Sequence, residues 1–147
     1  MNIKKMTVDE FKDLLILSSK AMLNSYKGKW GDGGIVFDRN FISEAVYSTY
    51  FNRKTDWDVL YKLWDWYADR DTMIILCHKT EYKKYTDDHV PEEAAKEILE
   101  TYYECMDNMT ITTKKKIWTL ILDTTDENLD LQIKTIVSVC GKIQEVT

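Results

Sequence analysis

An acidic and a basic side chain stand side by side in the stretch GGIVFDRNFISEAVY, at the point where a short apolar run ends. The pair is Asp38 and Arg39, followed by Ser43 and Tyr47, which are spaced about one helical turn apart. A guanidinium group offers a forked set of donors that matches phosphate, and a carboxylate offers oxygens to Mg²⁺ or to its bound water. These residue types therefore predict a phosphate site, with Arg39 as its ligand and Asp38 near a metal ion.

Two other apolar runs also end in polar or charged residues. One is followed by Cys77, His78 and Lys79, and the other by Asp123 and Thr124. Ligands of open α/β sheets bind at the carboxyl ends of the strands, so these segments are expected to meet at one edge of a sheet. Such a layout is typical of phosphoryl-transfer sites, where positioning and charge neutralisation do most of the catalysis.

The segment HKTEYKKYTDDHV is polar and has no regular period, which predicts a loop or lid over about residues 79–90. It carries Lys79, Lys83 and Lys84, whose positive charges could close over phosphate groups. Other interpretations fit the same residues. A charged residue just past a strand is common because the chain is leaving the core there, and lysines in a loop also fit a solvated surface.

The apolar periodicity predicts alternating helices and strands. Short, largely apolar runs predict buried parallel strands at Ile35–Asp38, Met73–Cys77 and Ile117–Leu122. Helices are predicted over about Val8–Tyr26 and Phe41–Phe51, along the face from Trp57 to Ala68 after Thr55 or Asp56, and after the capping box Thr124-x-x-Glu127. A further helix is predicted from a first turn with Pro91, and its buried face is expected to be Ala94, Ala95, Ile98, Leu99, Tyr102, Cys105 and Met106. The order predicts one α/β domain over residues 1–147, with a parallel sheet between two helical layers.

The cysteines and the last helix supply expectations about burial. Cys77 and Cys140 lie among apolar residues and are expected to be buried. The three cysteines form no CxxC pair, which argues against a disulfide framework or a zinc site. The last helix is expected to turn one apolar face inward, made of Leu129, Ile133, Ile136, Val137 and Cys140.

Composition narrows the class of protein further. The chain has 147 residues, a hydrophobic fraction of 44% and a net charge of −5, with a pI near 5.1. The negative charge argues against a general affinity for nucleic acid or for an anionic membrane. Because no apolar run is long enough for a signal peptide or a membrane span, we expect a cytosolic protein.

The Asp38-Arg39 pair, with Ser43 and Tyr47 behind it, resembles the pattern D-R-x-x-x-S-x-x-x-Y of thymidylate kinases. FDRNFISEAVY is especially similar to its versions in phage-type deoxynucleoside monophosphate kinases. The resemblance continues through MIILCHK, the DDH at the end of the lid and LILDTTDENLDLQIKTI, and covers residues 6–143 approximately. It implies the fold of P-loop nucleoside monophosphate kinases. It also implies their activity, the transfer of a phosphoryl group from Mg-ATP to a deoxynucleoside monophosphate.

The resemblance also implies a role for each candidate residue. Arg39 would hold the phosphate of the acceptor nucleotide, and Asp38 would lie near the Mg²⁺–phosphate centre. Tyr47 would pack against the deoxyribose, and Ser43 would help to place the acceptor. The cations of the lid would contact the transferred phosphoryl group.

The phosphate loop of that family, G-x-x-x-x-G-K-[ST], has no counterpart in this sequence. The nearest approach, Gly28…Gly33-Gly34-Ile35, lacks the Lys and precedes a predicted strand instead of following one. We therefore expect a truncated or split kinase chain without the first strand and phosphate loop, weakly active or inactive alone, which a complementing N-terminal fragment or a homodimer could complete. The alternatives are a non-catalytic kinase-like module that binds a nucleotide or a protein partner, and an unrelated small α/β domain.

Overall fold

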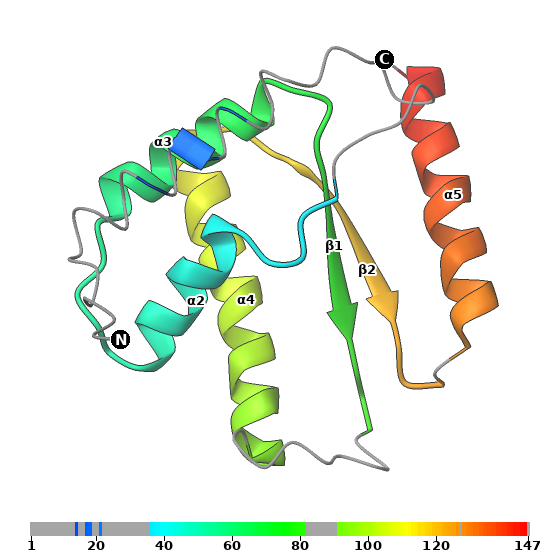
Figure 1. The fold of residues 1–147 in the computed structure, drawn as a ribbon, viewed down its shortest axis with the longest axis horizontal. Helices are drawn as coiled ribbons and strands as arrows, with labels where there is room; N and C mark the ends of the chain where they lie inside the picture. The colour runs from blue at the N-terminus through cyan, green and yellow to red at the C-terminus, as the bar shows by residue number, and fades with distance from the viewer. Residues whose placement is uncertain are drawn as a thin grey trace, which may run out of the picture.

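The computed structural model describes residues 14, 17, 18, 21, 36–81, 91–126 and 128–146, with side chains up to residue 142. Most of the predicted first helix, most of the lid and Glu127 lie outside the described residues. The elements follow one another in the order α2 (Phe41–Tyr50), α3 (Trp57–Ala68), β1 (Met73–His78), α4 (Glu92–Thr113), β2 (Trp118–Asp123) and α5 (Leu129–Val146) (Figure 1).

The two strands run parallel, and their register joins Met73 to Trp118 at one end and His78 to Asp123 at the other. The chain between them carries α4, because a parallel pair needs a crossover connection. In Figure 1 the strands lie between α5 on one side and the group α2, α3 and α4 on the other. The predicted mixed α/β class is confirmed, and two of the three predicted strands are present in the described part of the chain.

Local signals set the starts of the helices. The Asp56 side chain accepts a hydrogen bond from the Val59 amide at 3.3 Å, which confirms Asp56 as one of the two predicted caps of α3. Asn40 caps α2 by accepting from the Phe41 amide at 2.7 Å, and its side-chain amide also donates to the Tyr67 hydroxyl at 2.8 Å. Asn40 therefore fixes the start of α2 against α3.

The core lies between α2, α3, α4 and one face of the strands. Ala45 and Val46 of α2 and Met109 of α4 are completely buried, and Leu76 joins the same cluster from β1. The predicted apolar faces of α3 and α4 are confirmed, since their core residues include Leu60, Trp64, Tyr67, Ile98, Cys105 and Met106. Amphipathic helices of this length gain most of their stability from such packing.

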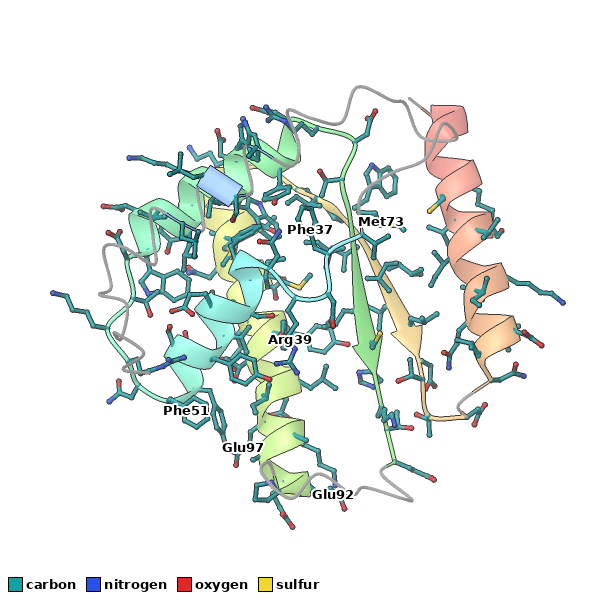
Figure 2. All side chains as sticks on the ribbon, viewed as in Figure 1. Phe37, Arg39, Phe51, Met73, Glu92 and Glu97 are labelled. Atoms are coloured by element: carbon teal, nitrogen blue, oxygen red, sulfur yellow. The ribbon has the colours of Figure 1, made fainter. Side chains whose placement is uncertain are left out.

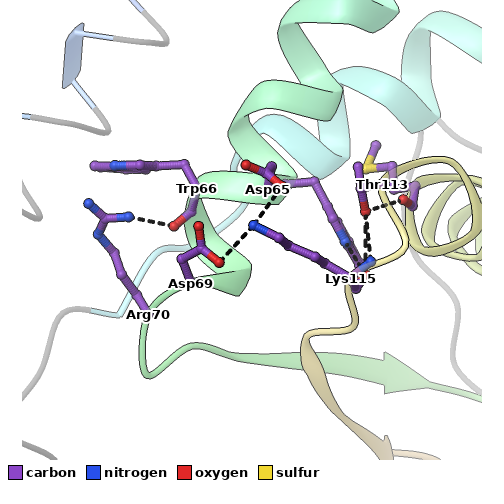
Figure 3. Close-up of polar contacts among 8 residues, drawn as sticks. Asp65, Trp66, Asp69, Arg70, Thr113 and Lys115 are labelled. Atoms are coloured by element: carbon purple, nitrogen blue, oxygen red, sulfur yellow. Dashed lines mark hydrogen bonds and ion pairs between the residues drawn. The ribbon is translucent and has the colours of Figure 1, made fainter.

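The turn between α4 and β2 is fastened to the end of α3 (Figure 3). Lys115 Nζ lies 2.8 Å from a carboxylate oxygen of Asp65 and 2.8 Å from one of Asp69. The Lys115 carbonyl accepts a hydrogen bond from Trp64 Nε1 at 2.9 Å. Hydrogen bonds to both carboxylates raise the pKa of Lys115 above its ordinary value.

The predicted strand Ile35–Asp38 is not observed over its described residues, 36–38. Val36 is 93% exposed, and the chain bends at Asp38 and Arg39 before α2 begins. A strand is stable only when a neighbouring strand pairs with its backbone groups, and β1 and β2 pair only with each other within the described ranges. Residues 36–38 therefore lead into α2 without forming a strand, with Phe37 half-buried against Tyr67.

Several predictions about the last helix are wrong. Leu129, Ile133 and Val137 are 65%, 49% and 65% exposed, because α5 contacts β2 through a different side of the helix. Ile136 and Cys140 are half-buried, so only part of the predicted inward face touches the protein.

The predicted cap of α5 and the predicted burial of one cysteine also need correction. Asn128 caps the helix by accepting from the Leu131 amide at 3.1 Å, whereas Thr124 donates to the His78 carbonyl at 2.8 Å through its amide and 3.2 Å through its hydroxyl. Cys77 is exposed, because successive β1 side chains point to opposite faces of the strand. Leu76 points to the face that joins the core, and Cys77 points to the other face. None of the described helices is long and apolar enough to cross a membrane.

Candidate anion-binding site

Arg39 stands directly before the cap of α2 with a backbone φ of 63°. This left-handed conformation is uncommon for a residue with a side chain, and such residues cluster at binding sites. The side chain is exposed, and its guanidinium carbon lies 5.5 Å from the centre of the Tyr47 ring, close enough for a cation–π contact. Arg39 therefore presents a positive charge beside the first two turns of α2 (Figure 2).

Ser43 lies in the first turn of α2, and its hydroxyl oxygen is 2.7 Å from the hydroxyl of Tyr102 on α4. The two residues are 59 positions apart in the sequence, and both are half-buried. The sequence indicated Tyr102 only as part of the buried face of α4. Nothing in the local pattern identified it as a neighbour of the candidate phosphate site.

Tyr102 lies within electrostatic reach of both Tyr47 and Arg39. Burial raises the pKa of Tyr102 above its ordinary value, while the hydrogen bond with Ser43 and the charge of Arg39 act in the opposite direction. These residues, Arg39, Ser43, Tyr47 and Tyr102, form what we call the Arg39 cluster. It combines a cation, the tyrosine ring that the cation contacts and a hydrogen-bonded pair of hydroxyl groups.

The carboxyl ends of β1 and β2 meet, as the sequence predicted for these two segments. Asp123 lies opposite His78 in the register, and the His78 carbonyl accepts from Thr124. Asp123 accepts a hydrogen bond from the Thr125 amide at 2.9 Å, and hydrogen bonding from Thr125 holds the pKa of this carboxyl below its ordinary value. The first lid residues are fastened here too, because the Thr80 amide donates to the Thr125 hydroxyl at 3.1 Å.

Helix α4 connects the strand ends with the Arg39 cluster. Tyr103 forms a 3.0 Å hydrogen bond with His78 Nδ1, and the preceding residue, Tyr102, forms the bond with Ser43. Consecutive residues of a helix project about 100° apart, so one turn of α4 reaches both α2 and β1. The cluster and the strand ends therefore adjoin the same turn of α4.

The remaining predicted site residues are Asp38 and the three lysines of the lid. Asp38 is exposed, and Lys79 is half-buried. Lys83 and Lys84 lie outside the described residues. Their expected roles at the transferred phosphoryl group, and the expected role of Lys79, stay predictions.

The described residues contain no group of three or more His, Cys, Asp and Glu side chains able to hold a metal ion. Asp38 supplies a single exposed carboxylate, which suits only a Mg²⁺ that takes its other ligands from phosphate groups and water. The expected Mg²⁺ and ATP therefore stay predictions as well.

Comparison of the chain with models of protein families, with curated proteins and with solved structures finds no match.

Proposed function

We propose that the Arg39 cluster binds the phosphate of a deoxynucleoside monophosphate, as the acceptor site of a thymidylate-kinase-like P-loop nucleotide kinase. The observation that carries this proposal is the Arg39 guanidinium over the ring of Tyr47, one turn along α2 from Ser43, whose hydroxyl is bonded to that of Tyr102. A guanidinium and hydroxyl donors suit a phosphate monoester, and a tyrosine ring offers an apolar face to a sugar. The parallel strands and the meeting of their carboxyl ends support the same proposal.

The reaction proposed for the complete site is transfer of the γ-phosphoryl group of Mg-ATP to the bound monophosphate. This sequence contains no phosphate loop to cradle the donor phosphates, and that cradle supplies much of the electrostatic stabilisation in such enzymes. We therefore expect the isolated chain to bind the monophosphate but to transfer phosphoryl groups slowly or not at all. With a complete donor site, the enzyme would act as a nucleotide kinase in the cytosol.

Titration calorimetry with dTMP, the other deoxynucleoside monophosphates and ATP tests the proposal. We expect binding of at least one monophosphate, loss of that binding in Arg39→Ala, and little change in Arg53→Ala. Arg53 is a matched control because its guanidinium also lies over a ring, 5.9 Å from the centre of Phe51, beyond the opposite end of α2. Absence of binding to every monophosphate would overturn the proposal.

A coupled kinase assay with Mg-ATP and the same monophosphates tests the second part of the proposal. We expect turnover far below the 1–100 s⁻¹ that is typical of kinases, on the order of that for the reaction without protein. Turnover of the purified chain in the ordinary range would contradict the expectation of weak activity. It would also show that the donor phosphates are held without a glycine-rich loop.

A second candidate function is a kinase-like interaction module, and the exposed apolar residues of α5 favour it. Leu129, Ile133 and Val137 repeat every four residues along one side of the helix, and each is at least 49% exposed. Unpartnered apolar stripes of this kind mark interaction surfaces. Sedimentation velocity over a range of concentrations tests self-association, and Val137→Asp should then dissociate the dimer. A monomer at every concentration would contradict association through this surface.

A further inference from the structure

The hydrogen bond between Ser43 and Tyr102 leaves one hydroxyl proton of the pair free. If Tyr102 donates to Ser43, the Ser43 proton is available, and if Ser43 donates, the Tyr102 proton is available. No third hydrogen-bond partner of either hydroxyl occurs among the described residues. The pair therefore offers one donor to a ligand in either arrangement.

The two hydroxyls are held firmly by the elements that carry them. The Ser43 amide donates to the Asn40 carbonyl at 2.9 Å, so Ser43 sits in the closed first turn of α2. Tyr102 lies on α4 between the buried residues Thr101 and Cys105. Because α2 and α4 pack against each other in the core, the distance between the hydroxyls is set by the fold and not by a mobile loop.

The charge of the Arg39 cluster suits an oxyanion. Arg39 contributes one positive charge, and a phosphate monoester carries nearly two negative charges at neutral pH. A phosphate oxygen that is not opposite the guanidinium still needs a hydrogen-bond donor. The free proton of the hydroxyl pair is such a donor, and Ser43 lies about one turn before Tyr47, over whose ring the Arg39 guanidinium lies.

We infer that the Ser43–Tyr102 pair is the second anchor of the phosphate site, and that Tyr102 is the residue that positions the Ser43 hydroxyl toward the anion. This inference rests on the proposed function for the identity of the nucleotide, but it requires only that the site binds a phosphate group. It adds to the site a residue from α4 that the pattern of Asp38, Arg39, Ser43 and Tyr47 does not contain.

The experiment measures the affinity of the full chain for inorganic phosphate and for dTMP in the wild type, in Tyr102→Phe, Ser43→Ala and their double variant, and in the comparison variants Tyr61→Phe and Arg39→Ala. Ser43→Ala should weaken the binding of both probes about tenfold, the effect of losing one hydrogen bond to a charged group. Tyr102→Phe should weaken it by a smaller factor, because Ser43 keeps its proton and loses only the bond that positions it. The double variant should bind the probes no more weakly than the single variant that has the lower affinity, because the two hydroxyls act as one unit. Thermal unfolding of each variant checks that it folds.

Tyr61→Phe is the matched control, because the Tyr61 hydroxyl also bonds to α4, accepting from Asn108 at 3.0 Å. It should bind both probes as the wild type does. If Tyr102→Phe and Ser43→Ala also bind them as the wild type does, while Arg39→Ala does not, the inference is overturned and the proposed function stands. A third outcome is a wild type that binds inorganic phosphate but no nucleotide, together with loss of phosphate binding in Tyr102→Phe and Ser43→Ala. That outcome supports the inference and overturns the nucleotide proposal. A wild type that binds neither probe overturns both.

Discussion

The guanidinium carbon of Arg39 lies 5.5 Å from the ring centre of Tyr47. The backbone of Arg39 has a φ of 63°, which is a left-handed conformation. A left-handed conformation costs a residue with a side chain roughly 1–2 kcal/mol. The Asn40 cap follows immediately and fixes the start of α2 through bonds to Phe41 and Tyr67. The fold therefore holds Arg39 in a conformation that lowers stability, at the position where the sequence predicts phosphate binding.

Arg39→Gly and Arg39→Ala should differ in stability but not in binding. Glycine adopts a positive φ without steric cost, whereas alanine keeps the left-handed penalty. After the larger entropy of glycine in the unfolded chain is included, Arg39→Gly should be about 0.5–1 kcal/mol more stable than Arg39→Ala. Urea denaturation measures this difference, and calorimetry should show that both variants lose monophosphate binding. Equal stabilities would show that the backbone of residue 39 is not held at a positive φ in solution.

Stability should fall at alkaline pH, partly because of Tyr102. Its pKa is raised in the folded protein, mainly by burial, so its contribution is fully present below the ordinary tyrosine pKa of about 10 and is lost as pH rises through the folded value. Tyr102→Phe should reduce the slope of Tm against pH in that range. It should not abolish the slope, because the pKa of Tyr50 is also raised, by burial and by Glu97. An unchanged slope in Tyr102→Phe would contradict the burial of this hydroxyl.

Trp64 and Trp118 should respond differently to the same substitution. Trp64 is 1% exposed and donates to the Lys115 carbonyl at 2.9 Å, so Trp64→Phe leaves a cavity and removes the shorter of the two hydrogen bonds that this carbonyl accepts. We expect this variant to lose about 2–4 kcal/mol of stability. Trp118 is 54% exposed, so Trp118→Phe should change stability by less than about 0.5 kcal/mol. Denaturant unfolding followed by circular dichroism compares them, and equal losses would contradict the assignment of Trp64 to the core.

The contact of Lys115 with Asp65 and Asp69 should stabilise the protein weakly and in a salt-dependent way. These groups are partly exposed, and ion pairs of this kind are screened by salt. Lys115→Met should therefore lower Tm slightly at low ionic strength, and the difference should shrink at high salt. Because its partners raise the pKa of Lys115, the same contribution should disappear as pH rises through the folded pKa of this amine. A difference that is unaffected by salt would show that the Lys115 stem, and not its charge, stabilises the turn.

The short-range pattern was sufficient to predict most of the elements. Helices α2, α3 and α4 and strands β1 and β2 lie within a few residues of the predicted bounds. The cap at Asp56 and the apolar face with Leu60, Trp64 and Tyr67 were also predictable. These features depend on spacing along the chain and on hydrogen bonds between near neighbours, and the sequence contains both directly.

Tertiary packing alone decided the features on which the site depends. An apolar residue is buried only if another element covers it, so the sequence placed Val137 and Cys77 inside, whereas both are exposed. Likewise, an apolar run such as residues 36–38 forms a strand only beside a partner strand. The contact of Tyr102 with Ser43 spans 59 positions and exists because α2 packs against α4. The sequence by itself determined the residue types that could bind a phosphate group, and the packing of these two helices decided which of them lie together.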